Sequence, residues 1–255
     1  MSRIEELFKK KSKAVLSVYC TAGYPKLDSA RPLLKALQDG GADMIELGMP
    51  YSDPLADGPV IQQSSSQALA QGMTMQLLFE QLVGFRKEIS IPVLLMGYMN
   101  PVLQFGFDAF CAKASTLGID GLILPDLPMH EFETEYGPII QSYGLDFIFL
   151  VTPETSEARV RKLDSLSSGF LYAVSSSSTT GQKISMSDQS DYFERLQAMQ
   201  LKNPVLVGFG ISDRKSFQAA CRYTRGGIIG TAFIRAIGDA PDLHQATQIF
   251  LHGIL

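Results

Sequence analysis

Residues 14–48 read AVLSVYCTAGYPKLDSARPLLKALQDGGADMIELG, and they contain one complete strand–helix–strand unit. Two short apolar runs, 14–20 and 43–48, stand at its ends and are almost continuously apolar. Such runs are typical of parallel strands that are covered on both faces. Between them, residues 28–39 carry apolar side chains at helical spacing, namely Ala30, Leu33, Leu34 and Leu37. The stretch therefore predicts two parallel strands joined by a crossover helix.

The same unit repeats along the chain. Further runs that predict strands lie at 92–97, 120–125, 145–151, 169–175, 204–209 and 226–230. Further helical patterns lie at 74–88, 106–117, 130–143, 155–166, 188–200, 212–224 and 240–252. Eight strands alternating with eight helices fit either a doubly wound open sheet or a closed (β/α)8 barrel. The count of eight and the length of 255 residues favour the barrel. No linker divides the chain, so we expect a single α/β domain, a TIM barrel spanning 1–255.

The composition excludes several classes of protein. The net charge of −4 argues against a dedicated nucleic-acid-binding protein, which would carry a basic stripe. Three distant cysteines and three histidines give neither a disulfide framework nor the spacing of a metal site, so we expect no metal. No apolar run approaches the roughly 18 residues of a membrane span. The N-terminus lacks the apolar core of a signal peptide, and Ile4, Leu7 and Phe8 predict an extra amphipathic helix there. We therefore expect a cytoplasmic protein.

Three carboxylates gather where the second predicted strand ends. Glu46 lies inside the apolar run, where a carboxylate is costly unless it is solvated, paired or protonated. For Glu46 alone, a structural ion pair and a tuned general acid or base are equally good interpretations. Asp53 and Asp57 follow in a proline-rich loop, and each could be a simple turn residue. Because active sites of barrels lie at the carboxyl ends of the strands, three acids together favour a site.

Glycines follow the seventh and eighth predicted strands, in GFGIS at 208–212 and GGIIGTAF at 226–233. Glycine lets backbone N–H groups approach a ligand, and a helix N-terminus favours an anion. Gly210, Gly230 and Thr231 fit the place where barrels of this kind bind phosphate. Tight turns and helix caps are the alternative interpretation. The polar loop at 175–190 predicts a closing lid, and Gly181 could lend a further N–H group.

Other chemistries lack their residues. The chain has no G-x-S-x-G motif and no histidine at a predicted strand end, which argues against a serine hydrolase. No lysine lies inside a predicted strand, which argues against an imine mechanism. What is left is a pair of carboxylates and a phosphate anchor. This set suits acid–base cleavage or isomerisation of a phosphorylated small molecule.

One stretch of the chain is highly specific, namely IELGMPYSDPLADGPVIQ at 45–62. It is supported by TAGYP at 21–25, MGYMNP at 96–101, PDLP at 125–128, STTG at 178–181 and VGFGIS at 207–212. Through these blocks the sequence resembles the tryptophan synthase alpha subunit family. The resemblance covers nearly the whole chain. It implies a (β/α)8 barrel and a lyase that cleaves indole-3-glycerol phosphate, in a retro-aldol sense, to indole and D-glyceraldehyde 3-phosphate for tryptophan biosynthesis.

The resemblance also implies roles for individual residues. It makes Glu46 the acid/base and Asp57 the partner of the indole N–H group. The remaining residues that it implies for substrate binding are Tyr19, Tyr172, Thr180, Gly181, Phe209, Gly210, Gly230 and Thr231. One departure lies at the start of the lid. Many members of the family have Arg-Ser-Gly-Val-Thr-Gly there, whereas this chain has Ser-Ser-Ser-Thr-Thr-Gly at 176–181.

The resemblance implies a partner as well. The family forms an α2β2 complex with a beta subunit that holds pyridoxal phosphate, so we expect no cofactor in this chain. The implied contacts are the loop around Asp53, Asn100–Pro101 and 126–128, on the carboxyl face of the barrel. We expect weak activity alone and activation by the beta subunit. Two alternatives are a catalytically weak activator of that subunit, suggested by the altered lid, and an isomerase or epimerase of sugar phosphates.

Overall fold

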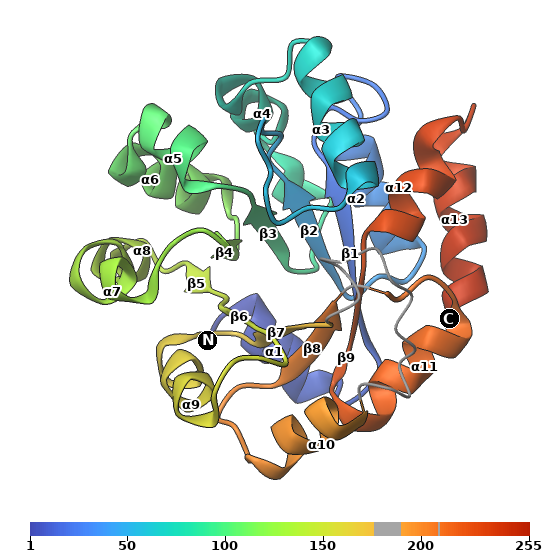
Figure 1. Cartoon of the computed structure of the whole chain (residues 1–255). Helices are drawn as coiled ribbons and strands as arrows, with labels where there is room; N and C mark the ends of the chain where they lie inside the picture. The colour runs from blue at the N-terminus through green and yellow to red at the C-terminus, as the bar shows by residue number, and fades with distance from the viewer. Residues whose placement is uncertain (176–189, 209) are drawn as a thin grey trace.

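The computed structural model describes residues 1–175, 190–208 and 210–255. Within these ranges, nine strand segments form one parallel sheet in the order β5-β4-β3-β2-β1-β9-β8-β7-β6. Their bounds are β1 (Val15–Thr21), β2 (Met44–Gly48), β3 (Val93–Met96), β4 (Gly121–Ile123), β5 (Asp146–Phe147), β6 (Leu150–Val151), β7 (Leu171–Val174), β8 (Val205–Gly208) and β9 (Gly226–Ile229). The strands lie at the centre of the molecule, with helices around them (Figure 1).

The sheet closes on itself between β5 and β6. These two segments stand at opposite ends of the sheet order, yet only Ile148 and Phe149 separate them in the chain. The Ile148 N–H group donates to the Leu122 carbonyl at 3.1 Å, and the Tyr172 N–H group donates to the Phe149 carbonyl at 3.0 Å. The predicted strand 145–151 is therefore one strand whose halves bond different neighbours. The closed α/β barrel predicted from the sequence is confirmed.

Each predicted helical range overlaps a helix of the structure, but the bounds of the helices differ from the predicted ones. Their bounds are α1 (Arg3–Lys10), α2 (Ala30–Asp39), α3 (Pro59–Ala70), α4 (Met75–Gln81), η1 (Phe85–Lys87), α5 (Met99–Phe105), α6 (Phe107–Leu117), α7 (Met129–Glu131), η2 (Phe132–Tyr136), α8 (Gly137–Ser142), α9 (Glu157–Leu166), α10 (Ser190–Ala198), α11 (Arg214–Tyr223), α12 (Thr231–Gly238) and α13 (Leu243–Ile254). The predicted helix 74–88 breaks before η1, because Gly84 adopts a φ of +75°.

In the described part of the chain, three helices were absent from the predicted pattern: α3, α5 and α12. Helix α3 buries mainly small side chains, Ser64, Ser65 and Ala68, together with Ile61. Because two of these are serines, the helix lacks the apolar period by which amphipathic helices are found. It begins at Pro59, which suits the first helical position since the ring fixes φ and no N–H group is needed there.

Side chains of the strands alternate between two layers of core. One cluster, which fills the barrel, contains Val15 and Tyr19 of β1 and Met44 of β2. The other lies between the barrel and its helices and contains residues such as Ile45 and Leu47. Successive side chains of a strand point to opposite faces. Glu46 therefore points into the barrel, as Met44 does, and this places a carboxyl group in its interior.

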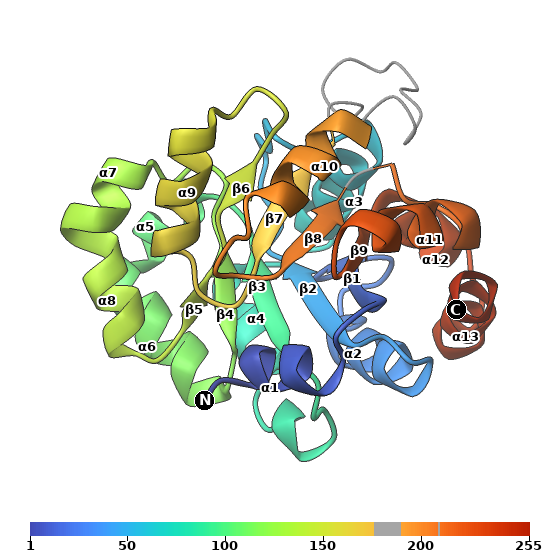
Figure 2. The ribbon, with the colours of Figure 1, turned by 90° about the horizontal axis from the view of Figure 1, so that it is seen from below.

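Helix α1 covers the amino-terminal end of the strands (Figure 2). Its Ile4 is fully buried in the cluster that fills the barrel, and the rings of Phe8 and Phe170 lie 6.3 Å apart. A capping box forms at its start, where the Ser2 hydroxyl accepts from the Glu5 N–H group and the Glu5 carboxylate accepts from the Ser2 N–H group. The predicted N-terminal amphipathic helix is confirmed, and its position leaves the opposite end of the barrel for a site.

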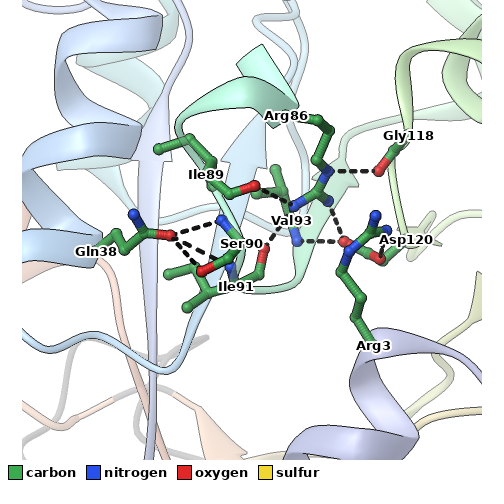
Figure 3. A network of polar contacts seen from close by, with 9 residues as sticks. All are labelled: Arg3, Gln38, Arg86, Ile89, Ser90, Ile91, Val93, Gly118 and Asp120. Atoms are coloured by element: carbon green, nitrogen blue, oxygen red, sulfur yellow. Dashed lines mark hydrogen bonds and ion pairs between the residues drawn. The ribbon is translucent and has the colours of Figure 1, made fainter. Parts of the chain in front are cut away.

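A buried carboxylate ties α1 to the starts of β3 and β4 (Figure 3). Asp120 accepts from Arg3 Nη1 at 2.9 Å, from the Val93 N–H group at 2.7 Å and from Arg86 Nη2. Arg86 in turn donates from Nε to the Gly118 carbonyl at 2.8 Å. The hydrogen bonds of this network satisfy the charges of Arg86 and Asp120, which are withdrawn from water. A buried ion pair requires such partners.

Replacing Asp120 with alanine is expected to lower the free energy of unfolding by about 3–5 kcal/mol, because Arg86 would keep a buried charge without its partner. The midpoint of urea unfolding measures the loss. Asp39→Ala is the control, since its ion pair with Lys35 lies at the surface and should contribute less than about 1 kcal/mol. Equal losses in the two variants would contradict this reading of the network.

Candidate active site

The two carboxyl groups predicted to do chemistry lie in β2 and in the loop that follows it. Glu46 has an exposed fraction of 0%. The Ser17 hydroxyl donates to Glu46 Oε1 at 2.8 Å, whereas Oε2 has no partner among the described residues. Burial raises the pKa of Glu46 to about 8, although the Ser17 bond acts in the opposite direction. At neutral pH the group is therefore mainly a neutral acid that can give up a proton.

Asp57 is held by its own loop and by one tyrosine. Its N–H group donates to the Pro54 carbonyl at 3.0 Å, and Tyr98 Oη donates to Asp57 Oδ2 at 3.0 Å. The Ala56 N–H group donates to the same Tyr98 oxygen at 3.0 Å. Burial raises the pKa of Asp57 to about 6, and the Tyr98 bond opposes the rise. The carboxyl group is thus mainly ionised at neutral pH, in a place where water is partly excluded.

Tyr19 and Tyr172 face the same space as the carboxyl groups. Burial and then the Asp57 charge raise the pKa of Tyr19, and burial followed by the Glu46 and Asp57 charges raises that of Tyr172. Strands β1, β2 and β7 therefore direct these predicted residues to one end of the barrel interior. A small cavity there is lined by Tyr19, Met49, Tyr51, Pro54, Asp57, Ser65, Met96, Gly97, Tyr98 and Pro125.

Tyr98 and Ser17 are contacts of the site that the sequence did not reveal. Tyr98 lies 41 residues from Asp57, and Ser17 lies 29 residues from Glu46. The motif around 96–101 marks the first, but only the folded arrangement shows its hydrogen bond. A polar residue within an apolar strand is the signal that could have found Ser17.

A glycine at the end of the neighbouring strand makes room for each tyrosine. A Cβ atom on Gly48 would lie 2.1 Å from Tyr19 Oη, and one on Gly208 would lie 2.2 Å from Tyr172 Oη. Both distances are far shorter than a van der Waals contact. The inward-facing glycines of β2 and β8 therefore allow two large rings to lie across the barrel mouth.

Replacing Gly48 with alanine is expected to lower kcat/KM about tenfold or more for the expected cleavage of indole-3-glycerol phosphate. The reason is that the new methyl group must push the Tyr19 ring out of its position. Overpacking should also cost about 1–3 kcal/mol of stability. Steady-state kinetics and thermal unfolding measure the two effects. Gly253→Ala, where a Cβ atom meets nothing within 4 Å, is the control and should leave kcat/KM unchanged. Wild-type kinetics in both variants would show that the Tyr19 position does not matter.

The predicted phosphate-binding residues follow neighbouring strands. Gly208 of β8 is paired in register with Ile228 of β9, so Gly210 and Gly230 each come two residues beyond the same level of the barrel. Gly230 is the N-cap of α12, without a side-chain cap, and Thr231 is the first residue of that helix. Gly210 has a φ of +75°, which disfavours other residues. The backbone N–H groups at the start of α12 are thus available for an anion.

Other predicted residues lie apart from this group or outside the described ranges. Asp53 is exposed and interacts with the Ser52 hydroxyl, so it does not join Glu46 and Asp57. Thr180, Gly181 and Phe209, with the predicted lid, fall outside the residues that the structure describes. In the described part of the chain, no group of three or more His, Cys, Asp or Glu side chains could hold a metal ion. Nor does that part contain a helix both long and apolar enough for a bilayer.

Comparison of the chain with known proteins shows the family to which it belongs. The family model described as "Tryptophan synthase alpha chain" matches residues 6–251. The chain belongs to the tryptophan synthase alpha chain family. The alpha chain of Flavobacterium johnsoniae is 49% identical over 241 residues, which cover 94% of this chain and 95% of that relative. The alpha chain of Parabacteroides distasonis is 49% identical over 255 residues, which cover 100% and 99%.

Solved structures show the same fold. Tryptophan synthase subunit alpha from Legionella pneumophila str. Paris superposes with a TM-score of 0.91 at 35% identity, covering 100% of this chain and 97% of the other. A chain of tryptophan synthase from M. tuberculosis, in an aminoacrylate-bound form, gives 0.86 at 30% identity and 100% coverage of both. The tryptophan synthase alpha family consists of lyases that cleave indole-3-glycerol phosphate for tryptophan biosynthesis. The resemblance and the lyase function predicted from the sequence are therefore confirmed.

Proposed function

We propose that Glu46 and Asp57 are the catalytic residues of indole-3-glycerol phosphate cleavage in this chain. The observation that carries the proposal is the contrast between them, since the pKa of Glu46 rises to about 8 and that of Asp57 to about 6. At neutral pH one group holds a proton and the other is an anion. Two groups whose surroundings separate their pKa values in this way are suited to different roles in one reaction.

The proton moves through Glu46 twice. The neutral acid first gives its proton to C3 of the indole ring, which leaves a carboxylate and a positively charged ring. Asp57 accepts a hydrogen bond from the ring N–H group and stabilises that charge. The Glu46 carboxylate then removes the proton of the side-chain hydroxyl next to the ring. As the aldehyde forms, the C–C bond breaks and its electron pair returns to the ring as indole, so Glu46 ends protonated again.

Substrate entry must enlarge the site that the structure shows. The cavity reaches Tyr19 and Asp57, whereas Glu46 is fully buried and does not line it. We propose that Gly210, Gly230 and Thr231 hold the phosphate and that the two tyrosines enclose the ring. The contributions expected from Thr180, Gly181 and Phe209 stay predictions. Binding energy from the remote phosphate would help to hold the reacting end of the substrate.

The rate of cleavage is expected to show a bell-shaped dependence on pH. Asp57 acts as an anion, so kcat/KM should rise with pH through about 6. Glu46 begins as an acid, so kcat/KM should fall as the pH passes about 8. Indole release from indole-3-glycerol phosphate, followed across this range, measures both limbs. A rate that keeps rising above pH 9 would contradict the role of Glu46 as an acid.

We also propose that this chain binds a beta-subunit partner that supplies pyridoxal phosphate, while the chain itself needs no cofactor. Hydrogen bonds join the segments that are expected to contact that partner. Asn100 Nδ2 donates to Tyr51 Oη at 3.1 Å, and both carboxylate oxygens of Asp126 accept from the Met99 N–H group at 3.0 Å. Leu55, between Asp53 and Asp57, is 94% exposed. A partner that covers this leucine would also steady the Asp57 loop, which supports activation within an α2β2 complex.

Indole release with and without a beta subunit tests the proposal. We expect slow turnover by the chain alone and faster turnover in the mixture. If indole never forms although the partner's own reaction is stimulated, the chain is the weak activator weighed as an alternative. Equal rates with and without the partner would contradict activation. A single domain over 1–255 and a cytoplasmic location also stay predictions.

A further inference from the structure

Ser17 is a polar residue in the middle of a buried strand. It belongs to β1, whose sequence is VLSVYCT, and its exposed fraction is 0%. In the ladder it stands opposite Met44 on one side and Ile228 on the other, and both belong to the apolar cluster that fills the barrel. A hydroxyl group buried among apolar side chains is costly unless it makes a hydrogen bond. Its bond, at 2.8 Å, goes to Glu46 Oε1.

The register of β1 and β2 builds this contact. Ser17 pairs with Met44, and Glu46 is two residues further along β2 on the same face. Diagonal neighbours of this kind point the same way and can touch across a sheet. Five consecutive residues of β1 are paired with β2 around them. The hydroxyl is therefore placed by the barrel itself, and it approaches the carboxyl group from the deeper, amino-terminal side.

We propose that Ser17 is the positioning residue of Glu46: its hydroxyl holds Oε1 as an acceptor, so that the acid proton is carried by Oε2. This inference rests on the catalytic role proposed for Glu46. In a neutral carboxyl group one oxygen carries the proton, and the other, the carbonyl oxygen, is the better acceptor. With Ser17 donating to Oε1, we assign the O–H group to Oε2. Oε2 is the oxygen that has no partner among the described residues, so nothing there competes for the proton that the substrate needs.

The same bond stabilises the carboxylate that is left after the proton has been given away. Among the residues that the structure describes, the titratable groups on which the Glu46 charge acts are Cys20 of β1 and Tyr172 of β7. Burial raises the pKa of both, so neither is charged near neutral pH. Leu94 of β3 stands opposite Glu46 in the ladder. Among the described residues, no lysine or arginine pairs with Glu46. Ser17 thus supplies the local stabilisation of the charged form.

Three substitutions at this position separate the hydroxyl from the space that it fills. Ser17→Ala removes the hydroxyl without adding bulk, whereas Ser17→Thr and Ser17→Val have nearly the same shape and differ in the hydroxyl. We expect Ser17→Ala and Ser17→Val to lower kcat about tenfold with little change in KM. We expect Ser17→Thr to stay within about threefold of the wild-type chain. The basic limb of the pH profile should move upward by about one pH unit in the two variants without a hydroxyl.

A measurement without turnover accompanies the kinetics. The chain is labelled with 13C at the glutamate carboxyl carbons, and the Glu46 signal, assigned by its loss in Glu46→Gln, is titrated by NMR. Its midpoint should rise in Ser17→Ala and Ser17→Val and stay near the wild-type value in Ser17→Thr. An unchanged midpoint in Ser17→Ala overturns the inference, and so does a Ser17→Thr variant that titrates like Ser17→Val. If Glu46→Gln is inactive while all Ser17 variants resemble the wild-type chain, the positioning role fails but the proposed function stands. If Glu46→Gln cleaves the substrate normally, the proposed function itself fails.

Discussion

Replacing Glu46 with glutamine is expected to lower indole release from indole-3-glycerol phosphate by about 10²- to 10⁴-fold, the contribution of a positioned general acid and base. Glutamine has the shape of the protonated acid and can still accept from the Ser17 hydroxyl, but it has no proton to transfer. The barrel should therefore fold, and D-glyceraldehyde 3-phosphate should bind with its wild-type affinity. Stopped-time assays of indole and calorimetric titration of the product measure the two quantities.

Glu88→Gln is the matched control, because it makes the same chemical change at an exposed ion pair with Arg31. It should leave indole release unchanged. If Glu46→Gln keeps more than about a tenth of the wild-type rate, proton transfer through Glu46 is not the source of catalysis. If Glu46→Gln also no longer binds D-glyceraldehyde 3-phosphate, the substitution has damaged the fold of the site and not only its chemistry.

Replacing Asp57 with asparagine should lower kcat by about 10²- to 10³-fold, the scale expected when one group that stabilises a transition-state charge is removed. Asparagine can keep the Tyr98 hydrogen bond and the position of the loop, but it brings no negative charge to the ring. The acid limb of the pH profile should disappear with it, since the carboxyl group with a pKa of about 6 has gone. Measurements of kcat from pH 5 to 9 test both effects.

Asp53→Asn is the control for Asp57→Asn. It removes a carboxylate from the same loop, but Asp53 is exposed and interacts with Ser52 instead of the site. We expect the isolated chain carrying Asp53→Asn to cleave the substrate as fast as the wild-type chain. A large loss there would mean that the loop acts through its total charge, whereas an unaltered acid limb in Asp57→Asn would assign that limb to another group.

The apolar runs predicted the barrel because each strand is buried on both faces and therefore appears in the sequence as a nearly continuous apolar run. The run at 145–151 is a single strand, as predicted, although its halves pair with different neighbours. The sequence signal is weak where a helix packs through small residues, and α3 was missed because it buries Ser64 and Ser65. Breaks were missed too, since Gly84 ends a helical pattern through its positive φ rather than through a change of polarity.

The site could be predicted where chemistry and place coincide in the chain. A glutamate in an apolar strand and an aspartate in the next loop indicated Glu46 and Asp57, and the structure directs both toward one end of the barrel. Contacts that depend on register could not be predicted. The bond from Ser17 requires β1 and β2 to pair in one register, and the bond from Tyr98 joins two loops that meet only after the barrel closes. The roles of these residues stay proposals.

The burial of Glu46 also couples folding to the uptake of a proton. Its pKa rises from 4.5 to about 8 in the folded chain, so between these pH values folding binds about one proton that the unfolded chain has released. The contribution of Glu46 to stability is therefore fully present below pH 4.5 and declines until the pH passes about 8. Mildly alkaline pH should therefore destabilise the folded barrel, because the buried Glu46 then becomes charged. The burial that gives Glu46 a proton to donate at neutral pH also makes the barrel less stable above that range.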